Sequence, residues 1–178
     1  MLRQIGAAPD RILPADIDES PKAGETPRLL ALRLAREKAR ASTLAGDATG
    51  AFVIAADTVV AVGRRMLPKA ETADQARRCL DLLSGRAHRV LTGVAVIAPD
   101  GRLAARLSES RLHFKRLNRT EIDRYLAGGV WRGKAGGYAI QGAAGAFVSA
   151  LQGSYSGVVG LPLYEALNLL EGLGYRRP

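Results

Sequence analysis

Asp57 is the side chain whose surroundings most strongly suggest chemistry. It stands in a near-continuous apolar run from Ala51 to Val62. Aspartate is depleted in strands, and an ionised carboxylate removed from water costs several kcal/mol unless something compensates it. A hydrogen-bonding cap, a salt bridge to a lysine or a metal ion would do so. The run alone therefore leaves a structural ion pair and a reactive carboxylate both open.

Two lysines and a second acidic cluster could converge on Asp57. Lys38 continues a four-residue apolar repeat in a predicted helix, which places it on or beside the buried stripe, and Lys69 lies in a short loop after the apolar run. Asp18 belongs to the acidic cluster Asp16–Glu19 before that helix. Carboxylates with lysines suit a divalent cation and a polyphosphate, because Mg²⁺ prefers oxygen ligands. The alternative is a loop-capping aspartate and a solvated lysine.

Two glycine-rich stretches are candidate binding loops. Gly133–Gly142 includes Lys134 and Gln141, and its glycines allow the backbone to approach a ligand closely. It matches neither the GxxxxGK[ST] phosphate loop nor the GxGxxG fingerprint, so a flexible or bulged β connection is an equal alternative. Gly153–Gly157 is similar and places Ser154 near a turn.

Other reactive residue types do not form a recognisable site. His88 and His113 lack the short spacing of a metal-binding pair and are interpreted as structural or surface residues. Cys79 is the single cysteine; it lies on an amphipathic helix, where we expect it to be packed, and it excludes an internal disulfide. Without a Gly-x-Ser-x-Gly motif, a serine hydrolase is disfavoured.

The elements that must position these groups predict an α/β protein, with a mixed sheet and flanking helices. The apolar run is interpreted as a central strand covered on both faces. Capping boxes, in which a polar residue is followed three positions later by Gln or Glu, open two of the helices. The expected elements are a helix from Thr26-Pro27 to about Ser42, a strand over Ala51–Val62, a helix between Thr72 and Gly85, a strand over Arg89–Ile97, a strand around Arg106–Phe114, a short helix between Asn118 and Gly128, a strand over Ala146–Leu151 and a helix over Leu163–Leu170.

Finer patterns within these elements make two further predictions. Along the strand Arg106–Phe114, Leu112 and Phe114 share one side with two serines, whereas charged residues alternate on the other side. In the first helix, Arg33, Arg36 and Arg40 are expected to face water.

Composition fits one globular domain over residues 1–178. The chain has 178 residues, of which 47% are hydrophobic and 24% charged. It shows no signal peptide and no apolar run near the ~20 residues of a membrane span, and one cysteine suits a reducing compartment, so we expect a cytoplasmic protein.

The charge balance invites an anionic partner. The net charge is +9 and the isoelectric point is about 10.3. Basic residues are scattered and lack the interleaved aromatic residues of single-strand nucleic-acid binders, which favours the phosphates of a small substrate over nucleic acid. Solvated helix faces remain the alternative.

Five ordered blocks, which together span nearly the whole chain, resemble the Maf-like nucleotide pyrophosphatases. They are Ala56-Asp57-Thr58-Val59-Val60; Leu82–Arg86 with His88–Gly93; Lys134-Ala135-Gly136 with Tyr138 and Ile140-Gln141-Gly142; Gly153-Ser154-Tyr155-Ser156; and Val159–Leu163. The resemblance implies a fold related to the inosine-triphosphate pyrophosphatases, with two lobes around a central cleft and often a homodimer. It also implies hydrolysis of a nucleoside triphosphate to the monophosphate and pyrophosphate, with Mg²⁺ or Mn²⁺.

The same resemblance implies roles for individual residues. Asp57 would accept a proton from water, Lys38 and Lys69 would hold phosphate charge, and Asp18 would stand with Asp57 at an acidic metal-binding position. Lys134 and Ser154 lie in matching blocks and are expected at the substrate. Thr58 and Gln141 match positions that separate subgroups, and the Ile-Gln-Gly form resembles the branch acting on dTTP and UTP. The Gln141 amide could both donate to and accept from a pyrimidine edge.

Two departures from the family pattern matter. Members normally have a strand and a Ser-x-Ser-Pro-Arg-Arg loop before a segment like Leu2–Gly6, and that block is absent here. Either the start codon was assigned too late, or the protein lacks its first strand and one wall of its site, and loss of that strand would expose strand edges. Pro68-Lys69-Ala70 replaces the usual Gly-Lys-Pro but keeps the lysine.

A hypothesis of another class stays open. The charge and the missing arginine loop would also fit a catalytically impaired basic protein that binds nucleic acid or regulates septum formation. Binding to short DNA and RNA as a function of salt would separate the two.

Overall fold

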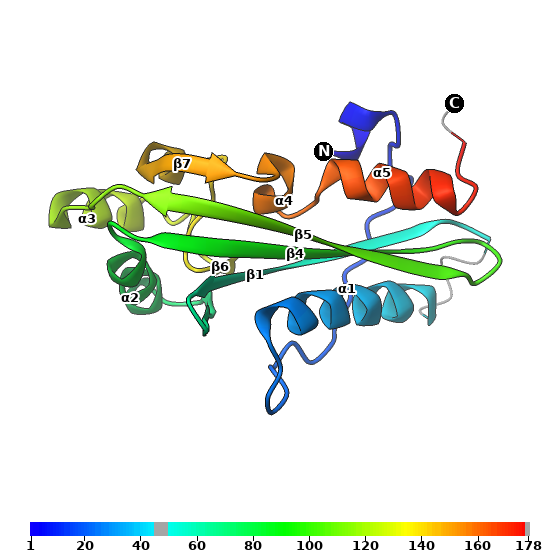
Figure 1. Ribbon diagram of the computed structural model, residues 1–178, viewed down its shortest axis with the longest axis horizontal. Helices are drawn as coiled ribbons and strands as arrows, with labels where there is room; N and C mark the ends of the chain where they lie inside the picture. The colour runs from blue at the N-terminus through cyan, green and yellow to red at the C-terminus, as the bar shows by residue number, and fades with distance from the viewer. Residues whose placement is uncertain (45–49, 177–178) are drawn as a thin grey trace.

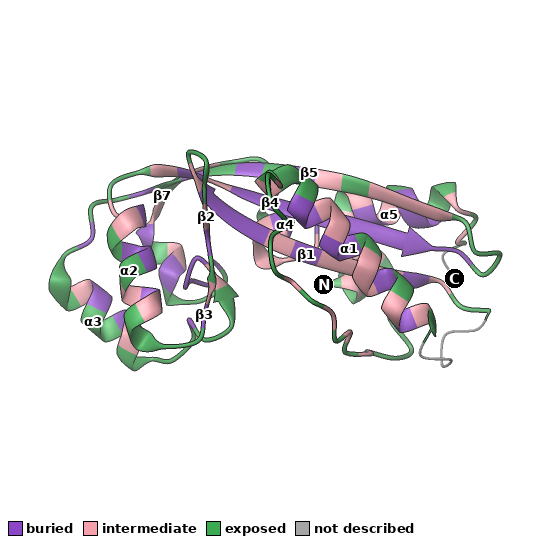
Figure 2. Ribbon diagram, turned by 90° about the horizontal axis from the view of Figure 1, so that it is seen from below, coloured by how far each residue is buried: buried purple, intermediate pink, exposed green. Residues whose placement is uncertain are grey.

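Two long antiparallel strands form the central framework of the molecule. The computed structural model describes residues 1–44 and 50–176. β4 (Ala87–Ile97) and β5 (Leu103–Phe114) run almost its full length. Figure 2 shows α2 and α3 clustered at one end of these strands and α1 and α5 at the other, so the expected two-lobed α/β arrangement is present.

The main sheet has five strands in the order β2-β1-β4-β5-β7, and its pairings are antiparallel. β1 (Val53–Val62) pairs with β4 along almost its whole length, but with β2 (Arg65–Leu67) only from Val60 to Val62. Over residues 53–59 the other edge of β1 has no strand partner within the described part of the chain. β1 thus lies between two strands and is covered on both faces, as its apolar run predicted, but only its last three residues pair with β2.

Helices cover opposite faces of the sheet in the larger lobe. α1 (Pro27–Leu44) packs on one face, where Leu30, Ala31 and Leu34 meet Val59 and Leu91. α5 (Leu163–Gly172) lies on the other face (Figure 1), where its apolar side meets Val94 and Val96 of β4. The strand residues alternate between these two faces, so odd-numbered positions of β1 point towards α1.

The smaller lobe is built over the opposite ends of the long strands. Its core joins Leu80 of α2 and Tyr125 of α3 to Phe114 of β5. The elements of this lobe and the remaining short elements are α2 (Ala73–Leu83), α3 (Arg119–Ala127), β3 (Lys69–Ala70) paired with β6 (Lys134–Ala135), the 3-10 helix η2 (Ala143–Phe147), β7 (Val148–Gln152), α4 (Tyr155–Val159) and the 3-10 helix η1 (Leu2–Ile5).

Most predicted elements are confirmed, with shifted ends. Thr72 and Asn118 each form a complete capping box, at the starts of α2 and α3. Leu112 and Phe114 are buried on one side of β5 with the two serines, as the alternation predicted. The strand expected from Ala146 begins at Val148, because η2 occupies the preceding residues.

The prediction for Arg33 was wrong. It was expected to face water, but its side chain is only 15% exposed and holds a network of carboxylates. Cys79 is buried as expected, and His88 is buried while His113 is exposed.

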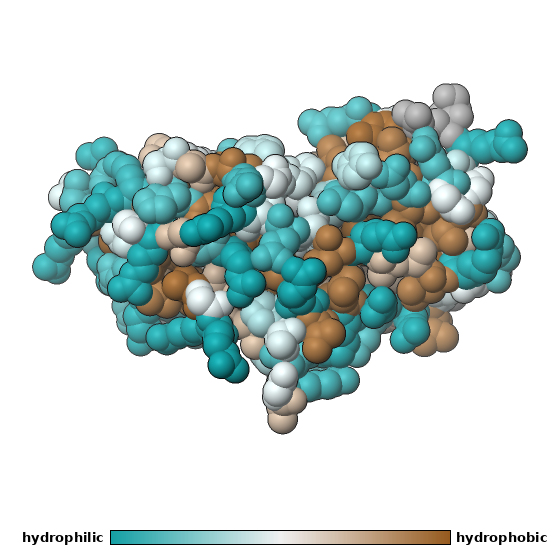
Figure 3. Space-filling model, in the orientation of Figure 1, coloured by the Kyte–Doolittle hydropathy of each residue, from teal (hydrophilic) through white to brown (hydrophobic). Residues whose placement is uncertain are grey.

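The visible surface carries its polar residues in a dispersed pattern. Figure 3 shows hydrophilic side chains spread over both lobes on this face, with apolar patches between them and no continuous hydrophilic stripe. Among the described helices, none combines the length and apolarity required to cross a membrane.

Candidate active site

Two neighbouring residues of β1 point to opposite faces of the sheet. Asp57 lies opposite Gly93 of β4 on the face covered by α1 and is 5% exposed. Thr58 lies opposite Thr92, and their hydroxyl oxygens are 2.9 Å apart. Thr92 donates to the carbonyl oxygen of Gly157 in α4 at 2.7 Å. The pleat of one strand therefore presents an acid to α1 and a hydroxyl to α4.

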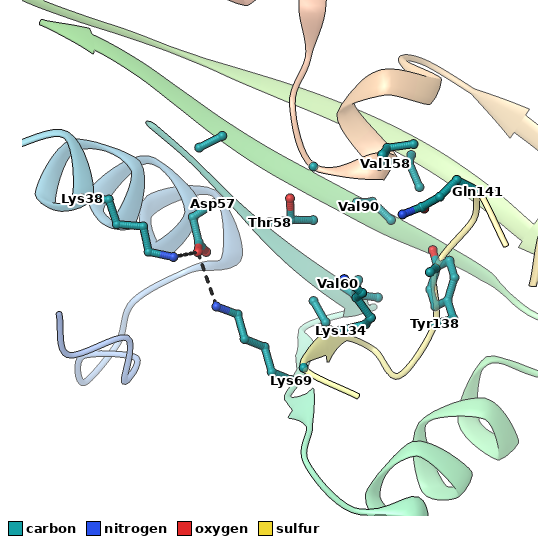
Figure 4. A pocket seen from close by; sticks show the side chains of 16 residues that line it. Lys38, Asp57, Thr58, Val60, Lys69, Val90, Lys134, Tyr138, Gln141 and Val158 are labelled. Carbon is teal, nitrogen blue, oxygen red and sulfur yellow. Dashed lines mark hydrogen bonds and ion pairs between the residues drawn. The ribbon is translucent and has the colours of Figure 1, made fainter. Parts of the chain in front are cut away.

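Asp57 belongs to a four-membered cluster of charges. Lys38 Nζ lies 2.5 Å from Asp57 Oδ1 and 2.7 Å from Glu19 Oε1. Lys69 Nζ contacts Glu19 Oε2 and lies 3.7 Å from Asp57 Oδ1. Figure 4 shows both ammonium groups approaching Asp57, one from α1 and the other from β3. Each lysine thus contacts both carboxylates, and we call these four residues the charge quartet.

Within the charge quartet, the surroundings favour the ionised forms of Lys38 and Glu19. Burial by itself lowers the pKa of Lys38, but hydrogen bonds to Asp57 and Glu19 outweigh it, so the pKa lies above the ordinary lysine value. Burial likewise raises the pKa of Glu19, but hydrogen bonds from Lys38 and Lys69 bring it below the ordinary glutamate value. Lys38 is therefore cationic and Glu19 is anionic at neutral pH.

A cavity of about 270 Å³ extends from the charge quartet to the other side of β1. Figure 4 shows Lys38, Asp57 and Lys69 at one end, Gln141, Val158 and Tyr138 at the other, and Thr58 between them. The lining residues are Lys38, Ala56, Asp57, Thr58, Val60, Lys69, Val90, Gly133, Lys134, Ala135, Tyr138, Ala139, Gln141, Val158, Val159 and Gly160. One end is charged and the other is largely apolar with one amide, which suits a ligand that has both an anionic and a flat organic part.

The loop that carries Gln141 is held in place by a close contact with β1 and by hydrogen bonds to buried side chains. Gly136 has a φ of 69°, and a Cβ there would lie 3.0 Å from the Val60 side chain, so a larger residue would be strained and would press on Val60. Tyr125 accepts a hydrogen bond from the Ala139 amide at 3.1 Å, and Tyr138 pairs with His88 Nε2 at 2.8 Å. The stretch expected to be either a flexible connection or a binding loop is thus a tethered loop that lines the cavity.

Ser154 lies beside the cavity but not in its lining. Its hydroxyl caps α4 by accepting from the Gly157 amide at 3.0 Å, and α4 then supplies Val158 and Val159 to the cavity wall. The structure therefore gives Ser154 a positioning contact, whereas Lys134, Thr58 and Gln141 line the cavity directly.

Glu19 is the acidic residue that the sequence reasoning missed. Asp18 is exposed, and its carboxylate accepts from the Ser20 amide at 2.9 Å, which lowers its pKa; the structure does not bring it to Asp57. An available signal was the alternation of this segment, in which Ile17 and Glu19 share the partly buried side.

Arg33 of α1 holds the segment that carries Glu19. Its guanidinium donates to Glu25 at 2.7 and 2.8 Å, to Glu37 at 2.8 Å and to the Ser20 carbonyl oxygen at 2.9 Å. The pKa of Glu25 falls to about 2, chiefly because of the hydrogen bond from Arg33. Since Ser20 follows Glu19 directly, this contact fixes the segment against the helix that also bears Lys38.

The donor set for a metal consists of two carboxylates. Asp57 and Glu19 are both within reach of the same ammonium groups. No cluster of three or more His, Cys, Asp or Glu side chains suited to a metal occurs in residues 1–44 and 50–176. Such a pair fits Mg²⁺ that takes its other ligands from phosphates and water, and it does not form a complete protein cage.

Comparison with known proteins places the chain in a family. The family model described as Maf-like protein matches residues 1–173. A relative from Caulobacter vibrioides, named dTTP/UTP pyrophosphatase, is 66% identical over 99% of this chain and 90% of its own length. Proteins of the same name from Maricaulis maris and Mesorhizobium japonicum are 62% and 60% identical, over 98% and 99% of this chain and 83% and 86% of their own lengths. The chain therefore belongs to the Maf-like family.

Proposed function

We propose that this protein is a nucleoside triphosphate pyrophosphatase that acts on dTTP and UTP and releases the monophosphate and pyrophosphate. The observation that carries the proposal is the charge quartet at one end of a cavity whose other end holds Gln141. The names of relatives that are 60–66% identical over nearly the whole chain support the same substrates.

Asp57 and the two lysines have different roles in the proposed reaction. Water adds across the bond between the α- and β-phosphates: its oxygen bonds to the attacked phosphorus, its proton passes to Asp57, and the bridging P–O bond breaks. Lys38 and Lys69 neutralise the negative charge that develops on the phosphate oxygens. The proton then returns to solvent, and the enzyme is regenerated.

A divalent cation, Mg²⁺ or Mn²⁺, belongs to this proposal. Asp57 and Glu19 would hold it, because Asp18 points to solvent and caps its own loop. When bound, the cation supplies charge neutralisation at the phosphates and a more acidic bound water. The side chains provide only part of its coordination, so the phosphates would supply the rest.

Recognition of the base falls to the other end of the cavity. Gln141 offers both a donor and an acceptor, Thr58 offers a hydroxyl already paired with Thr92, and Val158 with Tyr138 provides an apolar wall. Lys134 at the rim adds a positive charge near the bound phosphates. This orientation places the triphosphate between Lys38 and Lys69 and the pyrimidine beside Gln141.

Product analysis would test the proposal. Purified protein with Mg²⁺ or Mn²⁺ should convert dTTP and UTP to monophosphate and pyrophosphate faster than dATP or GTP. Asp57→Asn should lower kcat by roughly a hundredfold or more, the usual contribution of a positioned base. Asp18→Asn is the matched control, since it removes the same charge from the neighbouring exposed residue, and it should retain activity. Release of orthophosphate, or equal activity of Asp57→Asn and the parent, would refute the proposal.

A further inference from the structure

The lysines of the charge quartet already have anionic partners in the protein. Two ammonium groups and two carboxylates make four contacts, and their formal charges cancel. A divalent cation that approaches Asp57 and Glu19 alone meets two ammonium groups at the same oxygens. The repulsion between like charges offsets the attraction of the carboxylates.

A triphosphate competes for the same lysines. Lys38 and Lys69 are the cavity lysines that touch Asp57, and a triphosphate in the cavity would place anionic oxygens beside both. When a lysine turns to a phosphate oxygen, it withdraws from a carboxylate oxygen, which then becomes available to a cation. A lysine–carboxylate contact is thus replaced by a lysine–phosphate contact and a cation–carboxylate contact.

The geometry singles out Lys69 as the lysine that exchanges. Lys38 is 16% exposed and lies 2.5 Å from Asp57, whereas Lys69 is 39% exposed and lies 3.7 Å from the same oxygen. Its main partner, Glu19, is itself 34% exposed. Lys69 also lines both the cavity described above and a second, more apolar cavity of about 420 Å³ that contains Glu19. It can turn from Glu19 to a phosphate with little change in burial.

We infer that Lys69 couples metal and triphosphate binding: it blocks the carboxylates Asp57 and Glu19 until a triphosphate draws it away. The inference rests on the proposed function and adds a binding property to it. Such coupling is reciprocal, so the metal must strengthen triphosphate binding by the same factor. Lys69 thus has two roles, one towards phosphate and one towards the metal ligands.

Equilibrium binding of Mn²⁺, followed by electron paramagnetic resonance, tests this inference without turnover. The parent protein should bind Mn²⁺ at least roughly tenfold more tightly in the presence of non-hydrolysable α,β-methylene-dTTP, within the usual range of coupling. The Mn²⁺ complex of the analogue in solution is measured separately and subtracted. Lys69→Gln should bind Mn²⁺ alone more tightly than the parent does, on the order of tenfold, because one repelling charge is removed. Its coupling factor should be smaller than that of the parent by about the same factor, and the part that remains comes from direct coordination of the metal by the phosphates.

Two further variants separate this role from general effects. Lys69→Arg keeps the charge and should keep the weak binding of Mn²⁺ alone. Lys134→Gln removes the same charge from the rim of the same cavity without an ion pair to either carboxylate among the described contacts, and it should not change that affinity.

The outcomes distinguish the inference from the proposed function. An unchanged Mn²⁺ affinity in Lys69→Gln, or a coupling factor of one in a parent protein that binds the analogue, overturns the inference alone. Failure to bind the analogue and to hydrolyse any triphosphate overturns the proposed function, and the analogue-free Mn²⁺ comparison still tests whether Lys69 blocks the carboxylates.

Discussion

Gly93 allows α1 to lie directly on the sheet beside Asp57, and replacing it with alanine should measure how tight that contact is. A Cβ at position 93 would lie 2.2 Å from the Ala31 carbonyl oxygen and 2.6 Å from its carbonyl carbon. Ordinary contact begins at 3.4 Å, so the helix or the strand must move by about an ångström. Both clashing groups are backbone, and no side chain can rotate away.

The expected cost of Gly93→Ala follows from this geometry. Overpacking typically costs about 1–3 kcal/mol, and a backbone clash belongs at the upper end of that range. For a chain of this length, about 3 kcal/mol lowers Tm by roughly 6–12 °C. Displacement of α1 would also lengthen the 2.5 Å contact between Lys38 and Asp57, so activity should fall together with stability.

Urea denaturation and calorimetry would check this prediction. Gly172→Ala is the control, because a Cβ there meets nothing within 4 Å and its backbone is helical, so stability should stay constant or rise slightly. Without a clash, Gly93→Ala would also be neutral or stabilising, since alanine restricts the unfolded chain. A Tm equal to or above that of the parent would therefore refute the close approach of α1.

Three other predictions concern pH and specificity. Burial lowers the pKa of His88 to about 4, so between pH 6.5 and 4 the unfolded state binds a proton that the folded state does not. The free energy of unfolding should therefore decrease as pH is lowered through this window, by up to about 3 kcal/mol. His88→Asn should remove this pH dependence in urea denaturation. The pKa of Glu25 is depressed to about 2 by Arg33, so its stabilisation is present above pH 4.5 and lost as pH falls towards 2, and Glu25→Gln should destabilise the protein at pH 7 but not at pH 2. Gln141→Glu removes the amide donor and should lower the kcat/KM ratio of dTTP to GTP on the order of tenfold, the worth of one hydrogen bond; an unchanged ratio would remove Gln141 from base recognition.

Local signals in the sequence predicted local structure well. The capping boxes at Thr72 and Asn118 need only residues three positions apart, and the alternation in β5 needs only one buried face. Asp57 was identified for the same reason, since an acid within an apolar strand is anomalous without any knowledge of the fold. Its lysine partners followed from helix periodicity and from the resemblance.

Features set by tertiary contacts could not be predicted in this way. The two-residue strands that pair Lys69 with Ala135 are too short to carry a periodic signal. Glu19 and Asp18 are both acidic and adjacent in the sequence. Their different orientations follow from the hydrogen bond that Arg33 donates to the Ser20 carbonyl oxygen, a contact between distant parts of the chain. Arg33 itself was assigned to solvent because helix periodicity ignores the segment that folds back over it.

The alternation of β1 has a consequence for how its sequence can change. Asp57 and Thr58 serve different faces, so substitution at one leaves the other in place, and the two sides can vary independently. A single-residue insertion or deletion before them would instead turn the acid away from Lys38 and the hydroxyl towards it. Length variation should consequently be tolerated better at the turn Gly63–Arg64, which follows Asp57 and Thr58, than between residues 53 and 58, where it should be strongly selected against.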